Sequence, residues 1–269
     1  MTRLRSCTAL AVVGLALAGS LSACGAAELP RVTGHPTGMT GTWDLSFGDE
    51  FSGSELDRDL WQPNRYGSDE GDAPFNPDLE DAWFSPAATT VADGALHLTA
   101  QPGPRTVDGR RYPYRSGVVQ ALPTHELRAG TFLEARIDVP DCAGCWPAFW
   151  AAATESWPPE LDVMEYFDSA QDTRPSFNSI RSVTERSGPA EYGDPAVDHR
   201  EGYHVYGLWW DGSRVVPYLD GVAYPDLTAT GVLDVAMTVV LNLSVRAGGA
   251  PPAGSELLVD WVRVWQPQS

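Results

Sequence analysis

The sequence predicts an all-β sandwich, because short alternating strand patterns recur between turn signals and long amphipathic helical patterns are absent. In residues 89–101, Asp93-Gly94 marks a turn, and the residues after it alternate between apolar and polar as in a strand. Residues 131–139 alternate in the same way. The apolar content of 43% is enough for a sizeable core, and an all-β chain of 269 residues commonly forms a single domain.

Charge and composition limit the partners of the chain. The formal net charge is −18 and the isoelectric point is near 4.5, so no basic patch is available for the phosphates of a nucleic acid. The same charge disfavours heavily sulfated glycans. Ten Trp, nine Tyr and eight Phe supply flat apolar faces, which suit sugars but also packed β cores. A neutral polysaccharide therefore fits best.

Three carboxylates lie within six residues, at Glu160, Asp162 and Glu165, among apolar residues that favour a strand. Successive side chains of a strand point to opposite faces, so Glu160 and Asp162 share one face and Glu165 falls on the other. A β-bulge, which adds one residue near Val163 or Met164, would return Glu165 to the first face. The spacing therefore predicts a bulged strand that carries three acids in a row.

Such a row of acids suits cleavage of a glycosidic bond with retention of configuration. That reaction needs a nucleophilic carboxylate and a carboxylic acid about 5–5.5 Å apart, and two strand steps give roughly that spacing. The middle acid, Asp162, can hydrogen-bond to the nucleophile, and crowded like charges raise the pKa of at least one acid. The alternative interpretation is an acidic strand edge that faces water.

Tryptophans precede the acids. Trp146 and Trp150 are four residues apart, so they share a face of a strand, and they are candidate sugar-stacking residues. Trp157 is a further candidate. His204 lies far along the chain, and we interpret it as a structural histidine rather than a catalyst.

Three sequence blocks in order resemble glycoside hydrolase family 16. They are Gly130-Thr-Phe-Leu-Glu-Ala-Arg136, Trp146-Pro-Ala-Phe-Trp150 and Glu160-Leu-Asp-Val-Met-Glu165. The resemblance extends from about Trp43 to Trp265. It implies a jelly roll of two curved antiparallel sheets with a substrate groove across the concave face.

The resemblance also implies roles for the acids. Glu160 would be the nucleophile, Glu165 the acid/base, and Asp162 the residue that positions and tunes Glu160. The expected protein is an exported, monomeric endo-enzyme that hydrolyses β-1,3-glucan or mixed-linkage β-1,3-1,4-glucan without a cofactor. A transglycosylase on the same scaffold and a non-catalytic, lectin-like jelly roll are the alternatives. A pure binder would not need all three acids.

The family often carries a structural calcium ion, and the matching positions here are Glu50, Gly94 and Asp260. Carboxylate and carbonyl oxygens suit that hard cation. Three residues depart from the family pattern in places where sugar contacts are expected. They are Val118 in place of an arginine, Arg181 in place of a histidine and Arg246 in place of a glycine.

Residues 1–23 predict an export signal of the lipoprotein type, with an apolar run too short to span a membrane as a mature helix. Leu21-Ser-Ala-Cys24 resembles a bacterial lipobox in which Cys24 is acylated, and an ordinary cleavage site is the alternative. Residues 24–41 predict a flexible linker, and residues 42–267 predict the catalytic domain. The only expected contact with a membrane is the lipid anchor.

The cysteine count supports this division. After removal of the signal, Cys24, Cys142 and Cys145 remain, and lipidation of Cys24 leaves the other two as a pair. In an exported chain without a βαβ pattern, the Cys142-Ala-Gly-Cys145 spacing favours a local disulfide over redox chemistry. A zinc site would need two further ligands at suitable spacing.

Overall fold

The computed structural model describes residues 34–64, 71–225 and 235–268. The predicted signal and Cys24 lie outside these residues, so both stay predictions. Within the described ranges, no helix is long and apolar enough to cross a membrane.

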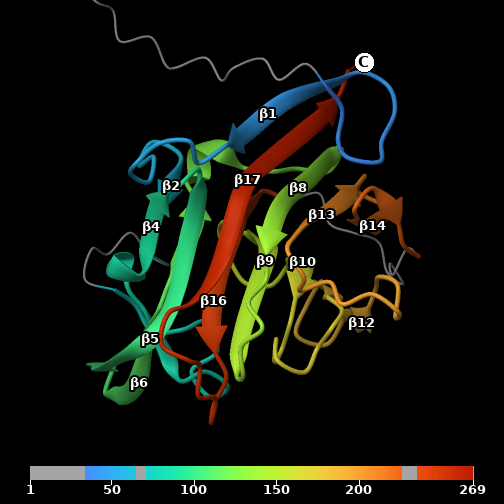
Figure 1. Ribbon diagram of the computed structural model, residues 1–269. Helices are drawn as coiled ribbons and strands as arrows, with labels where there is room; N and C mark the ends of the chain where they lie inside the picture. Colours follow the sequence, from blue (N-terminus) through green and yellow to red (C-terminus); the bar gives the residue numbers. More distant parts are fainter. Residues whose placement is uncertain (1–33, 65–70, 226–234, 269) are drawn as a thin grey trace, which may run out of the picture. The chain divides into compact units, whose positions relative to one another are not determined.

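Two β-sheets form nearly all of the regular structure in the described residues (Figure 1). The larger sheet contains β1 (Trp43–Asp49), β3 (Ala82–Phe84), β4 (Thr89–Ala92), β5 (Ala95–Val107), β6 (Arg110–Ser116), β8 (Thr131–Asp138), β13 (Tyr203–Trp210), β14 (Val215–Leu219), β15 (Val222–Ala223) and β17 (Ser255–Pro267). The smaller sheet contains β2 (Trp61–Gln62), β7 (Val118–Ala121), β9 (Cys145–Ala153), β10 (Glu160–Glu165), β11 (Ser176–Ile180), β12 (Arg186–Glu191) and β16 (Met237–Val245). The short 3-10 helices are η1 (Pro86–Ala88) and η2 (Pro123–His125).

The smaller sheet has the order β12-β11-β10-β9-β16-β7-β2, and all of its pairings are antiparallel. The acid-bearing strand β10 therefore lies between β9 and β11. Strand β9 also pairs along its whole length with β16, from Cys145 opposite Val245 to Ala153 opposite Met237. Segments far apart in the sequence thus become neighbours in the sheet that carries the acids.

The two sheets pack face to face, because alternate residues of their strands are apolar. On β9, Phe149 and Ala151 belong to the large core between the sheets, whereas Ala148 and Trp150 lie in a separate cluster on the outer face. Strand β16 divides in the same way, and every residue of it is buried. The predicted all-β sandwich is confirmed, and its smaller sheet has an apolar inner face and a mixed outer face.

The end of the predicted linker, residues 24–41, makes a contact with the domain at Thr37. Glu134 on β8 is only 1% exposed, and burial raises its pKa. A buried carboxylate needs hydrogen-bond donors. The backbone N–H of Thr37 donates to it at 3.0 Å, and the indole of Trp265 donates at 2.7 Å. This buried acid gives the segment before β1 a fixed contact that composition does not reveal.

A disulfide joins Cys142 to Cys145, the first residue of β9. Both cysteines are buried, and the hydroxyl of Ser169 donates to the carbonyl of Cys142 at 3.2 Å. The bridge closes the turn from which β9 begins. It therefore helps to fix the positions of Trp146 and Trp150 along that strand.

The division of β9 into two faces can be tested by truncation. We expect Phe149→Ala to lower the free energy of unfolding by about 3–5 kcal/mol, because it empties a fully buried position between the sheets. Trp157→Ala is the control, since that side chain is 51% exposed and should cost far less. Urea unfolding measures both variants, and equal losses would contradict the burial of Phe149 between the sheets.

Candidate active site

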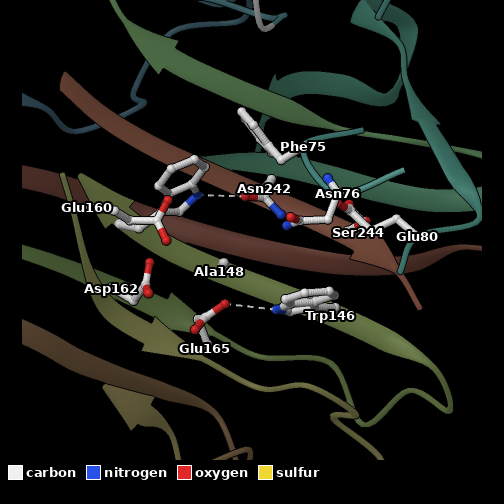
Figure 2. Close-up of a pocket in the computed structure, with 11 residues that line it drawn as sticks. Phe75, Asn76, Glu80, Trp146, Ala148, Glu160, Asp162, Glu165, Asn242 and Ser244 are labelled. Atoms are coloured by element: carbon white, nitrogen blue, oxygen red, sulfur yellow. Dashed lines mark hydrogen bonds between the residues drawn. The ribbon is translucent and has the colours of Figure 1, made fainter. Parts of the chain in front are cut away.

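A break in the strand register brings the three acids to one face of β10. Asp162 pairs with Trp150 of β9, but the next pair is Met164 with Phe149, so Val163 has no partner in that register. The register with β11 shifts over the same residues. Val163 and Met164 both enter the core, while Glu160, Asp162 and Glu165 line the outer face. The structure therefore contains the bulge that the spacing predicts, and Figure 2 shows the three carboxylates in a row.

Tyr192 anchors the bulge from outside β10. Its hydroxyl donates to the carbonyl of Val163 at 2.6 Å, and its ring is 4% exposed. A bulged residue leaves the regular ladder, so its backbone groups need other partners when they are buried. Tyr192 follows β12 in sequence, and no local pattern around Val163 indicates it.

The two outer acids have different hydrogen-bond donors. Glu160 accepts a bond from the indole of Trp157 at 2.7 Å. Glu165 accepts one from the indole of Trp146 at 3.0 Å and one from the amide of Asn178 on β11 at 2.5 Å. Trp146 and Trp157, which were candidate sugar-stacking residues, thus donate indole hydrogen bonds to the candidate catalytic acids.

Burial dominates the ionisation of Glu165. It is 8% exposed, and burial raises its pKa to about 7. The hydrogen bond from Trp146 opposes this rise, and the charge of Glu160 adds to it. Burial also raises the pKa of Glu160, while the bond from Trp157 and the charge of Arg186 lower it. Burial thus raises the pKa of both outer acids, and each has its own indole donor that opposes the rise.

Asp162 lies between the two outer acids on the same face of β10, and the charges of both act on it. Burial, followed by the charges of both neighbours, raises its pKa well above the ordinary value.

A groove with a volume of about 600 Å³ lies over this face and is lined by all three acids and all three tryptophans. Trp157 is half exposed at one side of it. Trp150 is only 7% exposed, because Phe75 packs edge-on against it at 4.7 Å between ring centroids. Its indole donates to Asn242 of β16 at 2.8 Å, as Figure 2 shows near the Asn242 label. Trp150 thus forms the groove floor and offers little open surface for stacking.

Several groove residues are not apparent from sequence reasoning. Asn178 and Asn242 stand on β11 and β16, and Ser244 donates a hydrogen bond to the buried carboxylate of Glu80. The signal that could have found Asn242 and Ser244 is their position as polar residues at alternate places in an otherwise apolar strand. For Glu80, which is 2% exposed in a loop, no such signal exists.

The three departures from the family pattern lie away from the groove lining. Val118 is fully buried beside Trp150 in the outer-face cluster. Arg181 pairs with Glu185 at 3.6 Å, and Arg246 pairs with Asp168 at 3.5 Å. None of these three described side chains is among the residues that line the groove.

The two acids among the expected calcium ligands, Glu50 and Asp260, are paired with arginines. The carboxylate of Glu50 accepts two hydrogen bonds from Arg263, at 2.8 and 2.9 Å. Asp260 pairs with Arg136 at 2.5 Å. A calcium site needs carboxylates whose charge is free for the cation. Here two guanidinium groups already neutralise both acids, which sequence matching of the acids alone does not show.

Comparison with known proteins places this site in context. Residues 75–263 match the family Glycosyl hydrolases family 16. The endo-1,3-1,4-beta-glycanase EglC of Rhizobium meliloti (strain 1021) is 28% identical over 240 residues, which cover 82% of this chain and 51% of that protein. The glucan endo-1,3-beta-glucosidase A1 of Niallia circulans is 26% identical over 264 residues, covering 84% and 38%. The chain thus spans about half the length, or less, of these relatives.

Solved structures have the same fold. The endo-beta-1,3-glucanase from Pyrococcus furiosus matches with a TM-score of 0.69 at 24% identity, over 85% of this chain and 96% of that chain. The laminarinase catalytic domain from Thermotoga petrophila RKU-1 matches with a TM-score of 0.71 at 21% identity, over 86% and 100%. The family match contains the bulged acid strand and most of both sheets, and the chain therefore belongs to Glycosyl hydrolases family 16.

Proposed function

We propose that the protein is an endo-acting β-glucanase that hydrolyses β-1,3- or mixed-linkage β-1,3-1,4-glucan with retention of configuration. The observation that carries the proposal is the row of acids on one bulged strand, in which burial raises the pKa of Glu165 to about 7. A lectin-like binder would gain nothing from a buried carboxyl group with such a pKa. Family membership and the named activities of the relatives support the same reading.

The proposed reaction has two steps. In the first, the Glu160 carboxylate attacks the anomeric carbon while Glu165 gives its proton to the departing glycosidic oxygen. The product of this step is a glycosyl ester of Glu160. In the second, Glu165 takes a proton from water, the water oxygen attacks the anomeric carbon, and the ester bond to Glu160 breaks. Asn178 orients Glu165 during both proton transfers, and Asp162 positions and tunes Glu160.

The charges of the groove favour a neutral glucan as the substrate. Four carboxylates line it, those of Glu155, Glu160, Asp162 and Glu165, and Arg186 is the single basic residue among its described lining residues. Arg186 already lies near enough to Glu160 to lower the pKa of that acid. A sulfated chain would meet net repulsion there. A glucan instead needs apolar ring faces and neutral hydrogen-bond partners, which Trp157, Phe75 and Asn178 can supply.

Chemical rescue tests the roles of the two glutamates. Glu165→Ala should lose hydrolysis of natural glucans but still form the intermediate from an activated aryl β-glycoside, whose leaving group departs without a proton. Added azide should then restore turnover and give a β-glycosyl azide. Glu160→Ala should give an α-azide, if it gives a product. Proton NMR identifies the azides.

The wild-type enzyme provides the decisive control for this assignment. NMR of its first product should show the β-anomer. Net inversion would exclude Glu160 as the nucleophile, and binding of glucan without any hydrolysis would favour the lectin-like alternative.

The pH profile should follow the proton on Glu165. Because the acid works in its protonated form, kcat/KM on glucan should be kept below pH 7 and lost as the pH rises through about 7. Trp146→Phe removes a bond that stabilises the charged carboxylate, so the alkaline limb should move up by about one unit. Trp150→Phe is the matched control, because its indole donates to Asn242. Equal movement of the limb in both variants would contradict this role of Trp146.

We also propose that the protein is exported and held at a membrane by lipidated Cys24, on the basis of the Leu21-Ser-Ala-Cys24 motif and the remaining cysteine pair. Cys24→Ser should move the protein from the membrane fraction to the soluble fraction, as measured by immunoblotting after ultracentrifugation. A variant that stays entirely with the membranes would argue against the anchor.

A further inference from the structure

A cluster of possible metal ligands lies outside the groove, at the end of the molecule where β13 begins. It consists of His199, His204 and Asp220, whose ligand atoms all lie within 4.8 Å of one another. None of the three is among the groove-lining residues. His204 is the second residue of β13, Asp220 lies in the turn between β14 and β15, and His199 lies in the loop before β13.

His199 is the unexplained member of this cluster. Its side chain is 5% exposed, and neither ring nitrogen makes a hydrogen bond to any part of the chain that the structure describes. A backbone group of Asp194 is near the ring but outside hydrogen-bonding geometry. Buried polar groups normally have a partner, and an orphaned one calls for an explanation. The other imidazole, His204, stands beside it with 5.3 Å between ring centroids.

The backbone holds all three residues in place. The carbonyl of His199 accepts hydrogen bonds from the buried hydroxyls of Tyr166 and Tyr206, at 3.3 and 3.0 Å. Asp220 is tied to Val205 through the Asp220 N–H, at 2.8 Å, and through its carboxylate oxygen Oδ1, at 2.9 Å. The second oxygen, Oδ2, lies 2.7 Å from Nδ1 of His204. The cluster is therefore largely preorganised, because Tyr166, Tyr206 and Val205 form hydrogen bonds that orient the possible ligands.

We propose that His199, His204 and Asp220 bind a divalent transition-metal ion, with zinc as the best match, at a structural site apart from the groove. Two imidazoles and one carboxylate are typical zinc ligands, and water can take the fourth tetrahedral position. Ligand atoms of tetrahedral zinc are roughly 3.3 Å apart, so the widest separation must contract by roughly 1.5 Å. The exposed Asp220 carboxylate can move to do so, and the proton between it and His204 leaves when the metal binds.

The bound ion would connect the loop before β13 with β13 and the β14–β15 turn. The same loop begins at Tyr192, whose hydroxyl holds the carbonyl of Val163 in the bulge. A metal at His199 would therefore stabilise the segment that supports the acid strand, without touching the reacting groups. The ion has a structural role in this proposal, and catalysis does not require it.

Binding of Co²⁺ and Zn²⁺ to the chelator-treated full chain tests the proposal. We expect one Co²⁺ per chain with the visible absorption bands of tetrahedral coordination, displacement of those bands by Zn²⁺, and a higher Tm in Zn²⁺. His204→Gln and Asp220→Asn should each weaken binding by about 10- to 100-fold and remove the rise in Tm. His199→Gln should do the same, and the two more exposed variants keep the test valid if that buried change prevents folding.

Two controls separate this site from other places on the chain. His97→Gln is the matched control, because Nδ1 of His97 also lies 2.8 Å from a carboxylate, that of Glu256, while its other nitrogen contacts the Ala92 carbonyl. It should leave binding unchanged, as should Glu165→Gln in the groove. Absence of tetrahedral bands at saturating Co²⁺, or wild-type affinity in both His204→Gln and Asp220→Asn, would overturn the proposal. Loss of binding in Glu165→Gln would place the metal in the groove and would also overturn it.

Discussion

One extra residue in β10 is the constraint on which the active site depends. Without it, Glu165 would point between the sheets, where Val163 and Met164 now pack, and an ionised carboxylate there would be very costly. With it, both apolar residues enter the core and the third acid joins the other two on the outer face. The hydroxyl of Tyr192 satisfies the carbonyl that the bulge removes from the ladder. The same core packing thus stabilises the fold and aligns the acids.

The three acids share one surface but differ in environment. Of the two outer acids, Glu165 has the pKa that burial raises further. The hydrogen bonds that it accepts only partly offset this rise. Glu160 is less buried and gains from Trp157 and from the charge of Arg186. Burial therefore raises the pKa of both outer acids, and the rise is large for Glu165.

The loop between β12 and β13 connects two features that are separate in function. It carries Tyr192 near its start, against the bulge, and His199 near its end, in the metal-ligand cluster. The backbone of His199 is in turn fixed by Tyr166, which directly follows β10. The acid strand and the cluster therefore share a frame of buried hydrogen bonds. Order in this loop bears on the geometry of the acids even though the cluster lies outside the groove.

The sequence by itself determined the features that depend on neighbours along the chain. Alternation with a period of two residues predicted the strands, and the spacing of Glu160, Asp162 and Glu165 predicted the bulge. These succeed because strand facing is a local property of the backbone. The pairing of Cys142 with Cys145 is local too, and the structure contains that bridge.

Only the tertiary structure decided which side chains contact the acids and the tryptophans. Asn178 and Asn242 come from strands 13 and 92 residues away from the side chains that they bind, so the sheet register selects them. Phe75, which lies in a loop, packs on Trp150 and buries it. The register also pairs Arg263 with Glu50 and Arg136 with Asp260. Such contacts depend on the relative placement of whole strands, which short-range patterns do not encode.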